Sequence, residues 1–318
     1  MDINKEILKL DWDREPQGLY QPIAYTLVAG GKRVRPQLAM IASKLFGGKE
    51  EEVLPAALAL EVFHNFTLVH DDLMDRAKVR RDRPTVHVQW NENTAILAGD
   101  QMMIEAYKLI TEVPEDKLPK VLRLFNKMAT EICEGQQYDV DFENKEEVSI
   151  DDYLKMIRLK TSVLLATALQ IGAYIAGAEQ QQQEALYQFG INVGLAFQIQ
   201  DDILDVWGEP DTFGKAVGGD ISCNKKTFVY LEAMRILGEK HEEEKRALQS
   251  WYSQVLDDNT EKIAAVKGLF EQFNVRSACE TVVENYTQKA LQILNGLPQN
   301  AAIEQLSQLA NKLNTRKD

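Results

Sequence analysis

Hydrophobic positions along this chain of 318 residues recur at the three- and four-residue spacing of amphipathic helices. In segment 37–47 the apolar positions follow this repeat, and the segment ends in glycine, a common helix stop. Three longer apolar segments, at 52–75, 152–177 and 185–208, have the same helical character, and more ordinary amphipathic helices are expected over 235–318. No convincing alternation of apolar and polar residues appears, and hairpin dipeptides such as Asn-Gly are absent. The pattern therefore predicts an all-α fold.

Composition favours one domain over residues 1–318, because no linker rich in proline or serine divides the chain and 45% of its residues are apolar. The most apolar stretch, 162–178, is short for a membrane span and contains Gln170, so we expect a buried core helix and no stable membrane insertion. Three cysteines without metal-type spacing indicate a reducing, cytoplasmic setting.

The net charge of −13 argues against nucleic acid as a partner, since nucleic-acid binding usually needs a strongly basic face. It does not exclude small anionic ligands, because a local basic cluster or a bound metal can reverse the field within one cavity.

Two acidic motifs with identical spacing end two of the apolar helices. They are DDLMD and DDILD, whose aspartates are Asp71, Asp72, Asp75, Asp201, Asp202 and Asp205. Positions four apart share a helix face, and like charges there, at the negative end of the helix dipole, are unfavourable unless they are compensated. Mg²⁺ is the natural compensating ion because it takes oxygen ligands and bridges carboxylates to phosphate. A solvated helix end is an equal alternative for one motif, but it becomes much weaker for two copies.

Basic residues accompany the acids at several places along the chain. They are Lys32, Arg33 and Arg35 in GGKRVRP, His64 on the helix of the first acids, Arg80 and Arg81 after them, Lys160 beside Thr161 in an apolar helix, and Lys215, Lys225 and Lys226 in a glycine-rich stretch. Such side chains hold diphosphate groups. Lys215 and Lys226 could instead be solvated loop charges, and His64 alone could be a core histidine. Lys160 has apolar flanks that indicate an inward position.

Two cationic sets, two acidic sets and a deep apolar cavity suit two diphosphates, at least one with an apolar tail. No Cys/His or Ser/His pair indicates covalent catalysis.

These motifs, in this order, resemble the trans-isoprenyl diphosphate synthases, the polyprenyl synthetase family that includes farnesyl and geranylgeranyl diphosphate synthases. The resemblance extends from GGKRVRP through DDLMD, RR, AGD, KT, FQIQDDILD and GK to NKKTF. One departure is Asp82, where the family usually has glycine after the two arginines.

The resemblance implies an isoprenoid synthase fold, a single-domain helical bundle around a deep central apolar cavity, and a homodimer. It implies that the six aspartates hold Mg²⁺, three ions per active site, against the allylic diphosphate. It assigns that diphosphate to Arg80, Lys160, Lys215 and Lys225, and isopentenyl diphosphate to Lys32, Arg35, His64 and Arg81. Thr161 and Gln198, with Lys160, would act at the reacting allylic carbon.

The implied reaction ionises the allylic diphosphate, joins it to isopentenyl diphosphate and eliminates a proton. In this family bulky residues before the first acidic motif limit the product, and here they are Phe66 and Phe63. Both could instead be ordinary core aromatics. With no insertion in DDLMD and an aromatic five residues before Asp71, we expect a C20 product ahead of C15.

Two other functions share part of this pattern. A terpene cyclase has the helical fold and one such motif, but it usually lacks the second motif and the set formed by Lys32, Arg35 and His64. A non-catalytic subunit of a heteromeric prenyl synthase typically loses acids or arginines, and none is missing here.

Overall fold

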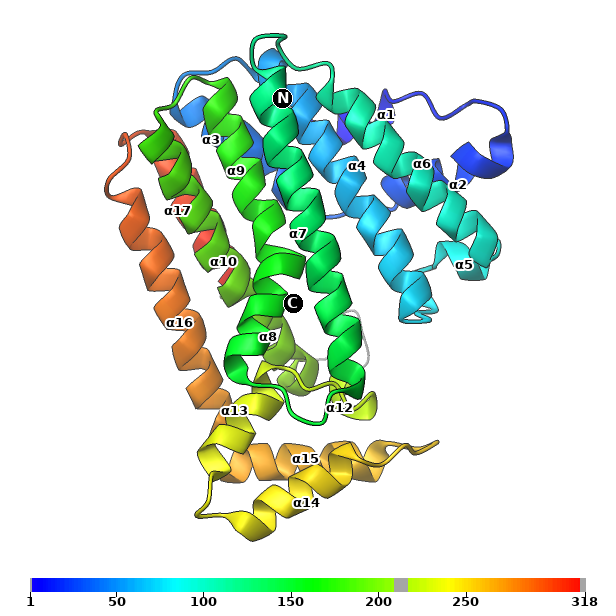
Figure 1. The fold of residues 1–318 in the computed structure, drawn as a ribbon, viewed down its shortest axis with the longest axis vertical. Helices are drawn as coiled ribbons and strands as arrows, with labels where there is room; N and C mark the ends of the chain where they lie inside the picture. The colour runs from blue at the N-terminus through cyan, green and yellow to red at the C-terminus, as the bar shows by residue number, and fades with distance from the viewer. Residues whose placement is uncertain (1, 209–216, 315–318) are drawn as a thin grey trace. The chain divides into compact units, whose positions relative to one another are not determined.

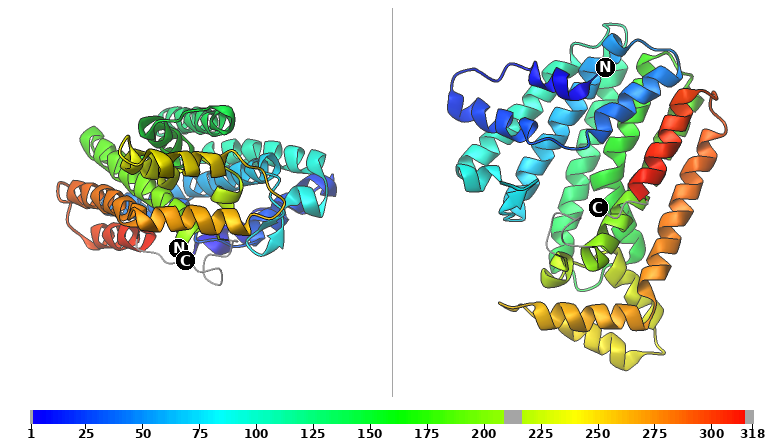
Figure 2. Two further views of the ribbon diagram at one scale, coloured as in Figure 1. Left: turned by 90° about the horizontal axis from the view of Figure 1, so that it is seen from below. Right: turned by 180° about the vertical axis from the view of Figure 1, so that it is seen from behind.

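The computed structural model describes residues 2–208 and 217–314, and helices account for most of them (Figures 1 and 2). In the first 110 residues the elements are α1 (Ile3–Leu8), α2 (Gln17–Val28), α3 (Val34–Leu45), α4 (Glu50–Met74), β1 (Val79–Arg80), β2 (Arg83–Pro84), α5 (Val86–Gln89) and α6 (Glu92–Ile110). They are followed by α7 (Leu118–Asn144), α8 (Ile150–Ile157), the π-helical turn η1 (Arg158–Ser162), α9 (Val163–Ile175) and α10 (Gln180–Trp207). The remaining helices are α12 (Gly219–Ser222), α13 (Phe228–Leu237), α14 (Glu242–Tyr252), α15 (Thr260–Gln272), α16 (Val275–Leu294) and α17 (Ala301–Asn314). The all-α prediction is confirmed.

The chain divides into two compact units. The first comprises residues 1–127, 164–187 and 297–306, and the second comprises residues 128–163, 188–296 and 307–318. The first acidic motif lies in the first unit and the second acidic motif in the second. The assignment of the whole chain to one domain, and the central cavity, stay predictions.

In the first unit, α4 lies between α3 and α6 and forms the centre of the core (Figure 1). Three glutamates open α4, where the positive end of the helix dipole favours them. Its interior is rich in buried alanine and leucine, and Phe63 is only 1% exposed. On α9, a Cβ added to Gly172 would lie 2.1 Å from the carbonyl oxygen of Ala39, so glycine permits the close approach of α3 and α9.

Among the described helices, α4 alone has the length and hydropathy of a membrane span, and 61% of its most apolar window is buried. A membrane span would expose its apolar side chains to lipid, whereas most of the apolar window of α4 is covered by the rest of the protein. The helix is thus a core helix, as expected for the apolar segments of the sequence.

In the second unit, α13 packs against α16 and α8, while α14 and α15 lie side by side (Figure 2). The short helix α12 contacts α15. Phe228 at the start of α13 and Phe270 near the end of α15 are both almost fully buried, so aromatic side chains fill this core.

The helix predicted over 152–177 is interrupted. Residues Arg158–Ser162 form a π-helical turn between α8 and α9, and this turn contains Lys160 and Thr161. A π-turn inserts one extra residue per turn and is frequently found at functional sites. Its side-chain pattern barely differs from that of an α-helix, so hydrophobic periodicity did not reveal it.

A β-hairpin follows α4 where the sequence pattern predicted no strands. Val79–Arg80 pairs with Arg83–Pro84, and the two turn residues, Arg81 and Asp82, have φ angles of 51° and 58°. Two positive φ values indicate the type I′ turn that two-residue hairpins favour. Aspartate tolerates this left-handed conformation better than most residues, which explains how Asp82 can stand where glycine is usual.

Candidate active site

Arg33 anchors the turn that carries Lys32 and Arg35. It is buried and left-handed, with φ 47°. Its guanidinium donates to Oε1 of Glu61 at 2.7 Å and to the carbonyl oxygen of Leu27. The turn is therefore tied to both α4 and α2, with Lys32 exposed and Arg35 half-buried beyond it.

The structure brings Arg35, His64 and Arg81, three residues predicted to bind isopentenyl diphosphate, into one electrostatic cluster. Burial lowers the pKa of Arg35 to about 10, although the Glu61 carboxylate raises it. Burial also lowers the pKa of Arg81, again with Glu61 acting in the opposite sense. Burial, followed by the repulsion of four nearby arginines, holds the pKa of His64 well below its usual value. His64 is thus a neutral imidazole among cations.

Asn65 links Glu61 to Arg81. Its Nδ2 donates to the Glu61 carboxylate at 3.1 Å and to the Glu61 carbonyl oxygen at 2.8 Å, and its Oδ1 accepts from Arg81 at 3.4 Å. Arg81 also donates to the carbonyl oxygen of Gly30 at 2.5 Å. Arg81 therefore connects Gly30, in the turn before α3, to Asn65 on α4.

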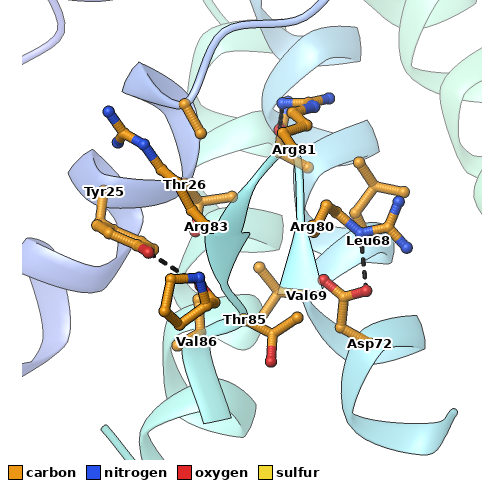
Figure 3. A pocket seen from close by; sticks show the side chains of 13 residues that line it. Tyr25, Thr26, Leu68, Val69, Asp72, Arg80, Arg81, Arg83, Thr85 and Val86 are labelled. Carbon is orange, nitrogen blue, oxygen red and sulfur yellow. Dashed lines mark hydrogen bonds and ion pairs between the residues drawn. The ribbon is translucent and has the colours of Figure 1, made fainter. Parts of the chain in front are cut away.

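The hairpin places Arg80 next to the first acidic motif (Figure 3). Its Nε lies 2.7 Å from Oδ1 of Asp72, which is 5% exposed. Burial raises the pKa of Asp72, and the charge and hydrogen bond of Arg80 oppose that shift. The hairpin and the neighbouring turns of α2 and α4 line a pocket that includes Tyr25, Asn65 and Arg81.

Asp71 and Asp75 lie one helical turn apart, since the Asp75 N–H donates to the Asp71 carbonyl oxygen at 2.8 Å. Asp71 is half-buried and Asp75 is exposed. The last turn of α4 contains no basic residue. Two carboxylates thus meet the negative end of the helix dipole, as the sequence predicted.

In the second motif, Asp202 and Asp205 are buried while Asp201 is half-buried. Oδ2 of Asp202 accepts from the Tyr153 hydroxyl at 2.6 Å and from the Phe228 N–H at 3.1 Å. Burial, with the nearby Asp220 carboxylate, raises the pKa of Asp202 well above its usual value.

Asp205 holds the start of α12. Its Oδ1 accepts from the Asp220 N–H at 2.9 Å, and its carbonyl oxygen accepts from the Gly218 N–H at 2.6 Å. Together with the contact from Asp202 to Phe228, this holds residues 218–228 at both ends to the second motif.

The π-turn places Lys160 and Thr161 beside two further polar residues. Nζ of Lys160 donates to Oδ2 of Asp139 on α7 at 2.7 Å, and Thr161 Oγ1 donates to Oε1 of Gln198 on α10 at 3.1 Å. Lys160, Thr161 and Gln198, predicted as one catalytic group, all lie in the second unit. Within this group of three residues, Thr161 and Gln198 are joined by a hydrogen bond, whereas Lys160 pairs with Asp139.

Two glycines allow α7 and α10 to approach the backbone of the π-turn. A Cβ added to Gly135 would lie 2.4 Å from the Lys160 backbone nitrogen, and one added to Gly194 would lie 2.5 Å from Cα of Ser162. Real Cβ atoms essentially never approach so closely, so larger side chains would displace this turn.

The lysines of the glycine-rich stretch occupy different settings. Nζ of Lys226 donates to the carbonyl oxygen of Lys145 at 2.7 Å, just beyond the end of α7. Lys225 directly follows the left-handed Asn224, and its N–H donates to the carbonyl oxygen of Asp220 at 2.9 Å. Lys215 lies outside the described residues.

The two predicted chain-length residues contact each other. The Phe63 and Phe66 ring centroids are 5.2 Å apart in an edge-to-face arrangement. Phe63 also meets Phe125 at 5.2 Å, whereas Phe66 meets His70 at 4.9 Å and is half-buried. Phe63 is thus a core residue, whereas Phe66 is partly exposed.

Within residues 2–208 and 217–314, no three His, Cys, Asp or Glu side chains are grouped closely enough to hold a metal ion by themselves. Each motif taken by itself still fits Mg²⁺, because Asp71 and Asp75 in the first and Asp201 in the second are at least partly accessible carboxylates, and Mg²⁺ typically takes one or two carboxylates together with phosphate.

Glu61, Asn65, Asp139 and Tyr153 were not identified from the sequence. Glu61 and Asn65 could have been found from their spacing, since they lie three residues before and one residue after His64 on the same helix. Asp139 lies in the polar run QQYD, but nothing in the sequence pairs it with a π-turn that periodicity cannot detect.

The chain is similar in sequence and in structure to known proteins. The family description Polyprenyl synthetase matches residues 16–272. A geranylgeranyl diphosphate synthase of Methanosarcina mazei is 43% identical over 220 residues, which cover 69% of this chain and 68% of that protein. A crystal structure of a geranylgeranyl pyrophosphate synthase superposes with a TM-score of 0.92 at 43% identity and covers both chains completely.

A polyprenyl synthase of Caulobacter crescentus, crystallised with calcium and isoprenyl diphosphate, superposes with a TM-score of 0.87 at 28% identity, over 99% of this chain and 94% of that one. The family match extends over most of the chain, from just before α2 to the end of α15. Together with the relatives, it shows that the chain belongs to the polyprenyl synthetase family.

Proposed function

We propose that this chain, a prenyltransferase of the short-chain isoprenyl diphosphate synthase type, condenses isopentenyl diphosphate with an allylic diphosphate and makes geranylgeranyl diphosphate as its main product. The observation that carries the proposal is the cluster of Arg35 and Arg81 around the neutral His64. Such a cluster can take up a diphosphate, whose negative charge would relieve the mutual repulsion of these half-buried arginines.

In this proposal the cluster of Arg35, His64 and Arg81 binds isopentenyl diphosphate. Arg35 and Arg81 supply guanidinium forks, the exposed Lys32 supplies a point charge, and His64 supplies a neutral hydrogen-bond donor. Glu61, through Arg33 and Asn65, keeps these groups in place before the substrate arrives.

The allylic diphosphate would be held by Arg80, Lys160 and Lys225, with Lys215 from outside the described residues. Mg²⁺ would be bound by the two acidic motifs and would neutralise the charge of the leaving diphosphate. Asp71, Asp75 and Asp201 are its candidate direct ligands because their side chains are at least partly exposed, whereas the buried Asp72, Asp202 and Asp205 suit a supporting role. A count of three ions stays a prediction.

The reaction breaks the bond between C1 of the allylic substrate and its diphosphate oxygen, and the electron pair leaves with the diphosphate. The isopentenyl double bond attacks C1, a new carbon–carbon bond forms, and a proton is lost to the released diphosphate. Lys160 stabilises the leaving group, and the oxygens of Thr161 and Gln198 face the positive charge that develops at C1. Apolar walls exclude the water that would otherwise trap the cation.

The test is incubation of the purified protein alone with Mg²⁺, isopentenyl diphosphate and an allylic diphosphate, followed by chromatography of the product. A linear C20 diphosphate is expected. A cyclic hydrocarbon would instead support a terpene cyclase, and no turnover would support a non-catalytic subunit. Replacement of Asp71 and Asp75 with alanine should abolish turnover, and an unchanged rate would contradict the metal assignment.

We also propose that the enzyme is a homodimer that uses α6. Ile96, Leu97 and Ile104 on this helix are 43%, 58% and 50% exposed, and covering such apolar side chains is favourable. Light scattering should report twice the monomer mass, and Leu97→Asp should shift it towards the monomer. A monomeric wild-type protein would contradict this assembly.

A cytoplasmic location accords with the cysteines. Cys133, Cys223 and Cys279 are all free thiols, which a reducing compartment preserves. Localisation of a tagged protein by cell fractionation would test this placement, and recovery from an oxidising compartment would contradict it.

A further inference from the structure

Lys262 on α15 is a fully buried lysine. Its exposed fraction is 0%, and its Nζ donates to Oδ1 of Asn224 at 2.5 Å and to the carbonyl oxygen of Gln254 at 3.1 Å. Both acceptors are neutral, and burial lowers the pKa of Lys262. Burying an ammonium group is costly, and these two hydrogen bonds offset part of that cost.

Asn224 occupies the turn immediately before Lys225. It adopts the left-handed conformation with φ 58°, and its Nδ2 donates to the same Gln254 carbonyl oxygen at 3.0 Å. Lys262, Asn224 and Gln254 therefore form a closed set of hydrogen bonds around one backbone turn. Because Lys225 is the next residue, the backbone conformation of this turn determines the position of the Lys225 side chain.

The helix that carries Lys262 also holds the other end of α12. Gly218 precedes α12 with φ 84°, and a Cβ added there would lie 2.9 Å from the side chain of Ile263. Since Ile263 and Lys262 are adjacent on α15, this helix contacts α12 at its start and just beyond its end (Figure 1). Residues 218–225 are thus held by α15 on one side and by Asp205 at their start.

We propose that Lys262 is a positioning residue that holds the Asn224 turn so that Lys225 can bind the diphosphate of the allylic substrate. This inference rests on the role of Lys225 in the proposed function. Lys262 itself has no exposed surface with which to contact substrate, so its effect must pass through the turn.

The first test is Lys262→Met, which keeps the apolar stem and removes the ammonium group. Loss of a hydrogen bond to a charged group costs enough to raise the KM for the allylic diphosphate about tenfold. The KM for isopentenyl diphosphate should stay within about twofold, because that substrate is assigned to other residues. Lys267→Met, a half-buried lysine on the same helix, is the matched control and should change neither constant.

A double-mutant cycle separates positioning from general stability. If Lys262 acts through Lys225, Lys262→Met should add nothing to the KM increase of Lys225→Ala. Asn224→Gly keeps the left-handed turn and removes the amide acceptor, so it should reproduce the effect of Lys262→Met. It also carries the test if Lys262→Met does not fold.

Three outcomes would overturn the inference. One is an effect of Lys262→Met that is fully additive with that of Lys225→Ala, and another is an equal rise in both KM values. The third is a raised KM in Lys225→Ala with an unchanged KM in both Lys262→Met and Asn224→Gly, which would leave the proposed function intact. An unchanged KM in Lys225→Ala would instead contradict the role of Lys225 in the proposed function, and the inference with it.

Discussion

Nζ of Lys160 lies 2.7 Å from Oδ2 of Asp139, so the lysine of the π-turn is paired with a carboxylate on α7. Both side chains are about one-quarter exposed, at 24% and 27%. A cation that is already held in place loses less conformational freedom when it binds a diphosphate. We therefore expect Asp139 to affect the allylic substrate indirectly, by holding Lys160 in place.

Asp139→Asn should lower kcat/KM for the allylic substrate about tenfold, because the neutral amide holds the ammonium group more weakly. Steady-state kinetics with varied allylic diphosphate would measure this loss. Asp141→Asn is the matched control, since Asp141 lies two residues further along α7 and accepts from Gln137 instead. Equal losses in both variants would contradict a specific role for Asp139.

Gly135→Ala and Gly194→Ala should each displace the π-turn, since the added Cβ atoms would lie 2.4 and 2.5 Å from its backbone. Overpacking of this kind costs about 1–3 kcal/mol in the free energy of unfolding. We also expect a larger fall in kcat than the loss of stability explains, because the turn carries Lys160 and Thr161. Chemical denaturation and kinetics would measure the two effects.

The control for these variants is Gly268→Ala on α15, where an added Cβ meets nothing within 4 Å. Alanine in a helix interior is more favourable than glycine, so this variant should be more stable by about 0.5–1 kcal/mol. If all three substitutions behaved alike, the close approach of α7 and α10 to the π-turn would not be what matters.

The apolar helices and both acidic motifs could be predicted from the sequence because each depends on local spacing. Segments 52–75 and 185–208 correspond closely to Glu50–Met74 and Gln180–Trp207. The π-turn could not be predicted, since its side-chain pattern barely differs from that of an α-helix and the glycines of α7 and α10 that lie against it are distant in the sequence. The hairpin was missed because its turn uses Arg81 and Asp82 in place of the usual asparagine and glycine.

Asp82→Gly should stabilise the hairpin, because glycine adopts φ 58° without the steric cost that aspartate bears. A gain of about 0.5–1 kcal/mol in the free energy of unfolding is expected. It should also lower the KM for isopentenyl diphosphate, since it removes a negative charge next to Arg81. Asp82→Asn tolerates the same turn and removes only the charge, so it should lower KM with little change in stability.

His64 predicts a pH dependence of stability. Its pKa lies well below 6.5 in the folded protein, whereas the unfolded residue has the ordinary value of 6.5. Well above pH 6.5 the residue is therefore neutral in both states, and its titration does not change the free energy of unfolding. Below pH 6.5 the unfolded chain takes up a proton that the folded chain refuses, and the free energy of unfolding falls until the folded pKa is reached. The loss is at most about 1.4 kcal/mol per pH unit.

His64→Gln should remove this component and keep the binding of isopentenyl diphosphate, because a neutral hydrogen-bond donor remains. Denaturation curves of both proteins between pH 5 and 8 would measure the difference in the free energy of unfolding. Below pH 6.5 this difference should change by at most about 1.4 kcal/mol per pH unit. If the two curves stayed parallel through this range, His64 would not be a neutral imidazole with a lowered pKa.

Phe66→Ala should lengthen the product beyond that of the wild-type enzyme. Phe66 is half-buried, one helical turn and a residue before Asp71, so removing its ring opens space where the growing tail would lie. Phe63→Ala is the matched comparison, because Phe63 is 1% exposed and packs against Phe125. That variant should lose about 3–5 kcal/mol of stability. Chromatography of the products decides between the two aromatic residues, and an unchanged length in Phe66→Ala would show that its ring does not limit the tail.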